Sequence, residues 1–160
     1  MSAFSKLLPL NHPIRVLYHY VRGIAAHWRY GRPGRNMTVI GITGTKGKTT
    51  TTNLIARGLS GNGARVFAFS TANYCMDGEW HENTTKMTSP SPFVLQRLLR
   101  EAENRGCTHA VIETSSHSVF YHRDYGVAYD TVVFTNLSRD HLDLHRTMAD
   151  YLATKKRLFE

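Results

Sequence analysis

The segment from Gly41 to Thr52, GITGTKGKTTTT, combines glycines, lysines and threonines in the manner of a loop that binds phosphate. The end of a Walker A loop, Gly-Lys-Thr, is present at residues 47–49, but the residue five positions before Gly47 is Ile42 and not glycine. Glycines stand at 41 and 44 instead. The segment could be a chance run of small residues, a nucleotide loop with one substitution, or the loop of a particular enzyme class.

The residue types in this loop suit a nucleoside triphosphate. Glycine lets the backbone approach phosphate oxygens closely, a lysine can contact the β and γ phosphates, and a threonine hydroxyl can ligate magnesium. We therefore predict an ATP-binding loop formed by Gly44, Thr45, Lys46, Gly47, Lys48, Thr49 and Thr50. For Lys46, a solvated surface position is the alternative interpretation.

The elements on either side of the loop support this prediction. Residues 37–42, MTVIGI, form a β-branched apolar run typical of a strand, and residues 49–59 have the pattern of a helix that ends at Gly61. The backbone N–H groups and the positive dipole end of such a helix converge on the loop, so an anion is expected there. This arrangement disfavours a chance run.

The rest of the chain predicts an α/β fold in which a parallel sheet is flanked by helices. Short apolar runs alternate with helical patterns, as in a sheet built with crossover helices. The predicted strands are 64–70, 108–114 and 130–136, the predicted helices are 91–105 (capped by Ser91) and 147–159, and a hairpin turns at Asp77 and Gly78.

The N-terminal segment, residues 1–36, is predicted to be a basic amphipathic helix followed by a linker, before a domain over 37–160. From Pro13 the apolar residues Ile14, Leu17, Val21, Ile24 and Ala25 recur at helical spacing, beside Arg15, Arg22 and Arg29. The arginines interrupt the apolar run, which disfavours a spanning helix. Two interpretations stay open: the helix packs against the following domain, or it lies on a membrane surface as a peripheral contact.

Charge is distributed unevenly along the 160 residues, which have a formal net charge of +8. Residues 1–76 contain ten Lys or Arg and no acid, and residues 77–160 contain ten Lys or Arg and twelve acids. Such a field could attract nucleic acid, an anionic membrane or a phosphorylated molecule. Because no basic motif is rich in aromatic residues, we expect no nucleic-acid partner. Two isolated cysteines, Cys75 and Cys107, suit a reducing, cytoplasmic compartment.

Four blocks of the sequence are distinctive: GITGTKGKTTTT at 41–52, TSPSP at 88–92, IETSSHSVFYHR at 112–123 and FTNLSRDHLDLHRTMADYLATKKRLF at 134–159. Together they resemble the Mur ligase family, in particular its members that add the third peptide residue to UDP-N-acetylmuramoyl-dipeptide. Their order and spacing match the family from about residue 37 onward. The resemblance implies the central ATP-binding domain of such a ligase, acting in peptidoglycan precursor synthesis with ATP, a UDP-muramoyl-peptide and an amino acid as small-molecule partners.

The resemblance also implies a mechanism and its catalytic residues. ATP would activate a carboxylate as an acyl phosphate, which an incoming amine attacks. Lys48, Glu113, His141 and Lys155 would be catalytic, with Thr49, Glu113, His141 and Lys155 around two magnesium ions. Lys155 would react with CO₂ to form a carbamate ligand. Only the neutral amine reacts, and a lysine of pKa about 10.4 is neutral at pH 7 in roughly one molecule in 2,500, so burial would have to lower this pKa.

Substrate contacts follow from the same resemblance. Thr88, Ser89, Ser115 and Arg123 match positions that hold the UDP-muramoyl-peptide, and the guanidinium of Arg123 suits a carboxylate or pyrophosphate. For the three hydroxyl residues, a cap or turn role is the alternative. Tyr121 departs from the glutamine of some members.

The departures from the family lead to further expectations. A short basic segment stands where members have a uridine-binding domain, and the sequence stops partway through the central domain. We expect the chain to be a fragment with little ligase turnover, and a monomer. A ligase for a lipid-linked or other carboxylate substrate, or a P-loop ATPase that is not a ligase, remains an alternative function. The identity of the added amino acid is not readable.

Overall fold

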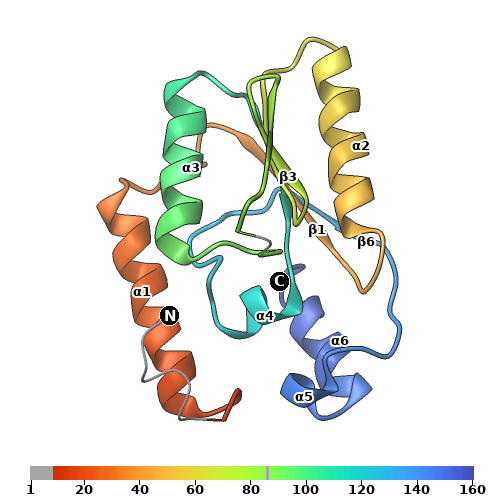
Figure 1. Ribbon diagram of the computed structural model, residues 1–160. Coiled ribbons are helices and arrows are strands. Elements are labelled where there is room, and N and C mark those ends of the chain that lie inside the picture. The colour runs from red at the N-terminus through yellow and green to blue at the C-terminus, as the bar shows by residue number, and fades with distance from the viewer. Residues whose placement is uncertain (1–8, 86) are drawn as a thin grey trace.

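The computed structural model describes residues 9–85 and 87–160, so the first eight residues of the N-terminal segment lie outside it. It contains a six-stranded sheet in the order β4-β3-β2-β5-β1-β6 (Figure 1). The strands are β1 (Thr38–Thr43), β2 (Val66–Phe69), β3 (Asn73–Met76), β4 (Glu79–Glu82), β5 (His109–Glu113) and β6 (Thr131–Phe134).

Four of these strands are parallel, as the sequence predicts. β1 lies between β5 and β6, and β2 pairs with the other edge of β5. The hairpin β3–β4 continues the sheet in the antiparallel direction beyond β2. Asp77 and Gly78 both have positive φ at its turn, 53° and 88°, which confirms the predicted hairpin.

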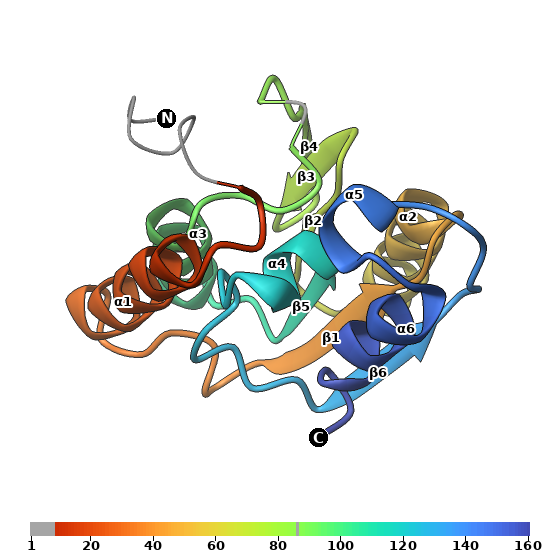
Figure 2. The same ribbon diagram turned by 90° about the horizontal axis from the view of Figure 1, so that it is seen from below.

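Helices cover both faces of the sheet. They are α1 (Pro13–Arg29), α2 (Lys48–Gly61), α3 (Pro92–Asn104), α4 (Ser116–Phe120), α5 (Leu142–His145) and α6 (Met148–Lys156). α2 packs on one face and α3 on the other, while α4, α5 and α6 gather beyond the carboxyl ends of the strands (Figures 1 and 2).

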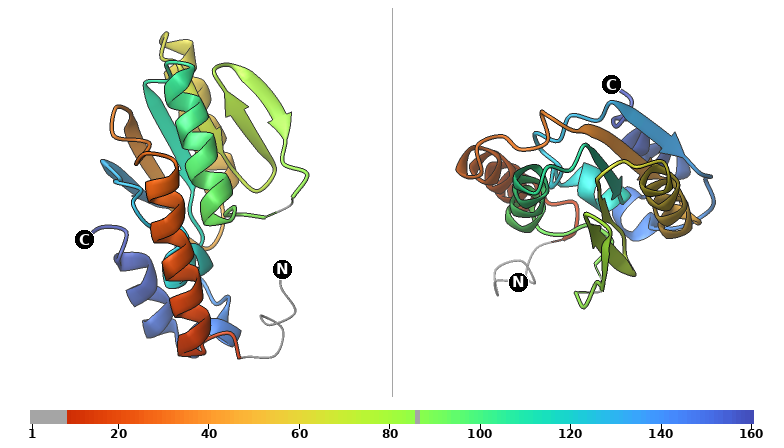
Figure 3. Two further views of the ribbon diagram at one scale, coloured as in Figure 1. Left: turned by 90° about the vertical axis from the view of Figure 1, so that its left-hand side faces the viewer. Right: turned by 90° about the horizontal axis from the view of Figure 1, so that it is seen from above.

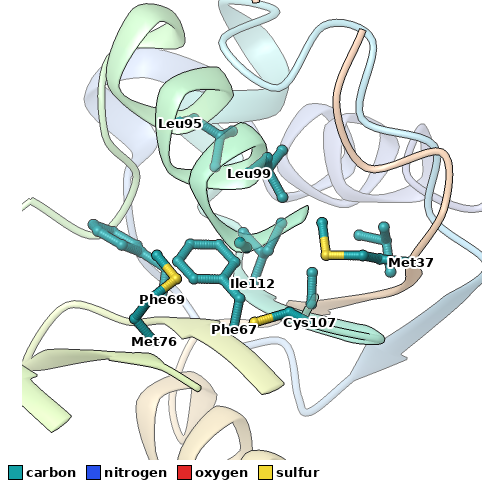
Figure 4. Close-up of a cluster of buried hydrophobic side chains, with 11 residues drawn as sticks. Met37, Phe67, Phe69, Met76, Leu95, Leu99, Cys107 and Ile112 are labelled. Carbon is teal, nitrogen blue, oxygen red and sulfur yellow. The ribbon is translucent and has the colours of Figure 1, made fainter. Parts of the chain in front are cut away.

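Two apolar clusters fix these layers, because successive strand residues point to opposite faces. Phe67 and Phe69 pack under Leu95 and Leu99 of α3 (Figure 4), whereas Val66 and Ala68 face α2. The helix predicted at 91–105 is confirmed and has Ser91 at its N-cap position, although the Ser91 side chain makes no capping hydrogen bond. The sequence patterns also missed the short helices α4 and α5.

The helix α1 packs beside α3, on the outside of the molecule (Figure 3). It also approaches the segment after α4 closely at Gly23, where an added Cβ would lie 2.8 Å from the carbonyl oxygen of His122 and 2.8 Å from Cβ of Tyr125. Gly23 and Ala26 are buried, while Ile14, Leu17 and Val21 are each more than half exposed. The helix therefore contacts the domain through Gly23, Ala26 and the ring of Tyr20, which packs on His122 and Tyr125, and it leaves these three apolar side chains exposed.

Candidate nucleotide and magnesium site

The loop between β1 and α2 leaves the start of a helix open to an anion. Gly47 occupies the N-cap of α2 with φ of 80°, and no side chain caps the helix. An added Cβ at Gly47 would meet no heavy atom within 4 Å, so no described residue packs against this side of the turn. Uncapped N–H groups and the helix dipole favour a phosphate at this point.

The segment after β6 holds the loop in place. The carbonyl oxygen of Asn136 accepts from the N–H of Thr45 at 2.9 Å, and its side-chain oxygen accepts from the N–H of Lys46 at 3.0 Å. Thr135 donates to the carbonyl oxygen of Lys46 at 2.7 Å. Gly44 has φ of 142°, and an added Cβ would lie 1.9 Å from Oγ1 of Thr135. Gly44 is therefore required by this close packing, whatever the loop binds.

The predicted loop residues differ in their surroundings. The ammonium group of Lys48 donates to the carbonyl oxygen of Thr45 at 2.8 Å, so its side chain lies along the loop. Thr45 is nearly buried, and its hydroxyl accepts from the N–H of Ser138 at 3.0 Å. Lys46 and Thr50 are exposed at the rim. The Lys48 side chain thus lies against the turn of the predicted phosphate loop, whereas the Lys46 side chain is exposed, as its alternative interpretation has it.

A buried carboxylate lies beside the start of α2. Glu113 ends β5, the strand next to β1, and is 2% exposed. It accepts hydrogen bonds from Oγ1 of Thr49 at 2.8 Å, from the N–H of Thr71 at 2.8 Å and from Oγ1 of Thr71 at 3.1 Å. The predicted pair of Thr49 and Glu113 therefore meets at the carboxyl edge of the sheet, where ligands bind in open α/β folds.

These oxygen atoms fit a magnesium ion. Mg²⁺ prefers hard oxygen ligands and uses one or two carboxylates together with phosphates and water. In the described part of the chain the buried carboxyl group of Glu113 has hydroxyl and N–H partners but forms no ion pair with a lysine, arginine or histidine. Thr49 and Glu113 would hold the ion against the nucleotide phosphates, where it would supply positive charge.

Thr71 extends this group towards the predicted substrate residues. Its hydroxyl lies 3.0 Å from the hydroxyl of Thr88, and the hydroxyls of Ser89 and Ser115 are 3.1 Å apart. Ser115 also caps α4 by accepting from the N–H of Ser118 at 3.2 Å. Ser115 therefore has the capping role that was the alternative to a substrate contact. The sequence interpretation overlooked Thr71, although its place just after a parallel strand was a usable signal.

Lys155 lies under the other side of the loop. It is 1% exposed, and its nitrogen donates to the carbonyl oxygen of Gly44 at 2.8 Å. Burial, followed by the charge of Lys48, lowers the pKa of Lys155 to about 8. Lys156, the next residue of α6, is exposed. Of the two adjacent lysines, Lys155 alone has the surroundings that the predicted carbamate requires.

Tyr151 connects Lys155 with His141. The Lys155 nitrogen lies 4.6 Å from the centre of the Tyr151 ring, and the His141 and Tyr151 ring centres are 6.2 Å apart. The Tyr151 hydroxyl is 3.3 Å from that of Thr45, so it also supports the loop. Within residues 9–85 and 87–160, no three His, Cys, Asp or Glu side chains form a group that could hold a metal. His141 and Lys155 thus stay predicted ligands of the second magnesium.

Arg123 lies apart from these groups, in a basic cluster beside α1. The guanidinium carbons of Arg123 and Arg15 lie 5.3 and 5.6 Å from the centre of the Tyr121 ring, and His19 packs on the same ring at 4.9 Å. The Tyr121 hydroxyl donates to the carbonyl oxygen of Leu10 at 2.5 Å. Tyr121 therefore attaches α1 to the end of α4, and α1 adds positive charge around Arg123.

Comparison with known proteins gives this geometry a family. The family model described as the Mur ligase middle domain matches residues 42–160, which include the loop, Glu113, His141 and Lys155. The chain belongs to the Mur ligase family. The resemblance of the four blocks is thereby confirmed.

Similar Mur ligases come from several bacteria. The chain is 44% identical over 139 residues to a UDP-N-acetylmuramoyl-L-alanyl-D-glutamate--2,6-diaminopimelate ligase of Corynebacterium glutamicum, covering 87% of this chain and 26% of that protein. It is 41% identical over 133 residues to a UDP-N-acetylmuramyl-tripeptide synthetase of Roseiflexus, covering 82% of this chain and 26% of the relative.

A solved Mur ligase structure has the same fold. A UDP-N-acetylmuramoyl-L-alanyl-D-glutamate--2,6-diaminopimelate ligase superposes with a TM-score of 0.71 at 31% identity, over 91% of this chain and 28% of that one. The chain therefore spans about a quarter of the length of the relatives it matches.

Proposed function

We propose that this chain forms the nucleotide site of an ATP-dependent amide-bond-forming ligase that extends UDP-N-acetylmuramoyl-L-alanyl-D-glutamate by one amino acid. The observation that carries the proposal is the 2.8 Å contact between Oγ1 of Thr49 and the buried carboxylate of Glu113, directly beside the uncapped start of α2. This pairs a phosphate loop with a magnesium-type carboxylate. The names of the similar ligases supply the substrate class.

The chemistry requires two anions to meet. The substrate carboxylate attacks the γ phosphorus of ATP, the bond to the β–γ bridging oxygen breaks, and ADP leaves, giving an acyl phosphate. The amine of the incoming amino acid then attacks the acyl carbon, and phosphate departs as the amide bond forms. Positive charge must offset the repulsion in the first step. Lys48 and the N–H groups at the start of α2 are the groups of this chain suited to that role.

Lys155 also affects the charge balance of the site. A buried ammonium group close to Lys48 is costly, which is why its pKa is lowered to about 8. Reaction of its neutral amine with CO₂ would replace that cation by a carbamate anion. We expect the carbamate, together with His141, to serve as the oxygen and nitrogen ligands of the second magnesium.

Binding measurements test the proposal. The chain should bind UDP-N-acetylmuramoyl-L-alanyl-D-glutamate in the presence of magnesium and a non-hydrolysable ATP analogue, as followed by calorimetry. Arg123→Ala should weaken this binding at least about tenfold, the effect of losing one charge-assisted contact, whereas Arg97→Ala, at an exposed position of α3, should not change it. Equal losses in the two variants would remove the support for a substrate contact at Arg123.

A further inference from the structure

The outer face of α1 is an exposed apolar row. Ile14, Leu17, Tyr18, Val21 and Trp28 follow the three- and four-residue spacing that places side chains on one face of a helix. Their exposed fractions are 53%, 59%, 43%, 53% and 60%. We call these five residues the outer row. The contacts of α1 with the described residues leave this row uncovered.

The helix cannot roll to bury the outer row, because its opposite face is closely packed. Gly23 has room for no side chain against His122 and Tyr125, and Ala26 is 0% exposed. An added Cβ at Gly126 would lie 2.2 Å from Nδ1 of His27 on the same side of α1. Figure 3 shows α1 lying outside α3, with its far side directed away from the sheet. The contact face and the outer row are therefore fixed relative to the domain.

Three arginines form a line along one edge of the outer row. Arg15, Arg22 and Arg29 are spaced by seven residues, which is close to two helical turns, so they share one side of α1. Arg22 donates to the hydroxyl of Tyr18 at 2.6 Å. Beyond the helix, the guanidinium carbon of Arg32 lies 3.6 Å from the ring centre of Trp28. The apolar face is thus bordered by cations and aromatic rings.

The charge around the outer row selects the partner. Residues 1–76 contain no Asp or Glu, so the charged side chains that α1 and its linker contribute are all basic. No described helix is long and apolar enough to cross a membrane. A helix with a basic edge, interfacial aromatic rings and one apolar face is suited to lie in the plane of an anionic bilayer surface. A partner protein would need an apolar groove with a matching acidic line on one side only.

We propose that α1 holds the protein against an anionic phospholipid surface. Leu17, Val21 and Trp28 enter the boundary between headgroups and acyl chains, and Arg22 and Arg29 contact lipid phosphates, whereas Arg15 packs on Tyr121. The fixed packing of α1 on α3 then sets the orientation of the whole domain on the bilayer. This proposal does not rest on the proposed function, because a nucleotide-binding domain of any kind could be held in this way.

Vesicle binding by the 160-residue chain tests the proposal. We expect the chain to float with vesicles containing about one third phosphatidylglycerol and to bind vesicles of phosphatidylcholine alone at least about tenfold more weakly. The chain has two tryptophans, so a Trp80→Phe variant leaves Trp28 as the reporter, and its emission should shift to shorter wavelength on the anionic vesicles. Equal binding to both kinds of vesicle, or to neither, would overturn the proposal.

Matched substitutions by glutamate distinguish vesicle binding through the outer row from nonspecific adsorption of the chain. Leu17→Glu should lower binding to the anionic vesicles at least about tenfold. Leu54→Glu, at a residue of α2 that is 66% exposed, should leave it unchanged. Circular dichroism should show both variants folded, because both residues are exposed. If Leu17→Glu instead dissociates a dimer of the chain in sedimentation experiments and vesicle binding is absent, the outer row is a surface between two copies and the membrane proposal is wrong.

Discussion

The nitrogen of Lys155 lies 2.8 Å from the carbonyl oxygen of Gly44, so a buried lysine from α6 supports the first turn of the phosphate loop. The second near contact of this nitrogen is Oγ1 of Thr43, at 3.4 Å. A lysine in such a place is unusual, because burying an ammonium group without a carboxylate is unfavourable. A substitution at Lys155 should therefore disturb the loop, and a substitution in the loop should disturb the surroundings of Lys155.

The first prediction concerns carbamate formation at Lys155. With a pKa of about 8, roughly a tenth of the side chain is the reactive neutral amine at pH 7, and about half at pH 8. A carbon-13 carbamate signal from labelled bicarbonate should therefore grow between pH 7 and pH 8.5. It should disappear in Lys155→Met and persist in Lys156→Met, since Lys156 is exposed. A signal that persists in Lys155→Met and disappears in Lys156→Met would assign the carbamate to Lys156 and contradict the prediction.

The second prediction concerns Glu113 as a magnesium ligand. Glu113→Gln replaces an acceptor of three hydrogen bonds by an amide that can accept at only one atom. We expect the magnesium dependence of ATP binding to weaken at least tenfold and the free energy of unfolding to fall by about 1–3 kcal/mol. Glu79→Gln is the control, because this carboxylate is 67% exposed and lies on β4. A magnesium dependence that survives Glu113→Gln would remove this residue from the site.

The third prediction separates the two glycines of the loop. Gly44→Ala would drive a methyl group into Thr135 and Asn136, so its free energy of unfolding should fall by about 2 kcal/mol or more. Gly47→Ala meets open space and should cost only about 1–2 kcal/mol, from its positive φ. Urea unfolding of both variants measures the difference. Equal destabilisation would mean that the segment after β6 does not constrain the loop.

The fourth prediction is an acid sensitivity of the α1 contact. Burial, then Arg123, Arg15 and Arg22, lowers the pKa of His19 to about 4. The unfolded chain protonates this histidine near pH 6.5, and the folded protein does so only near pH 4. The contribution of neutral His19 to the free energy of unfolding is therefore fully present above pH 6.5 and is lost as the pH falls towards 4.

Thermal unfolding measures this effect. His19→Gln should reduce the acid loss of the melting temperature by roughly a few degrees. His81→Gln, on β4, is the control and should leave that loss unchanged. An identical acid loss in wild type and His19→Gln would exclude His19 as the cause.

The local part of the site could be predicted from the sequence, and the tertiary part could not. Lys48 and Thr49 lie in a contiguous strand–loop–helix motif, and Glu113 ends a neighbouring strand, so pattern and topology together predict that they meet. The roles of Asn136 and Tyr151 depend on backbone and hydroxyl contacts between segments some ninety or more residues apart, which no local pattern encodes.

The N-terminal helix shows a different limit. Its start at Pro13 and its amphipathic spacing were predictable, because both are local properties. The face that contacts the domain was not, since close approach at Gly23 and Ala26 outweighs the larger apolar area of the outer row. Periodicity identifies an apolar face, but only the shape of the neighbouring surface decides whether that face is buried.

The measurement that tests the central claim most directly is calorimetric binding of Mg·ATP to the chain and to Lys48→Ala. The loop at 44–50, with Lys48 lying along its turn, should bind the nucleotide, and loss of one charge-assisted contact of about 1.5–3 kcal/mol should weaken it by roughly tenfold to a hundredfold. Lys156→Ala should bind as wild type does, because Lys156 is exposed on α6. Full ATP affinity in Lys48→Ala would contradict the assignment of this loop.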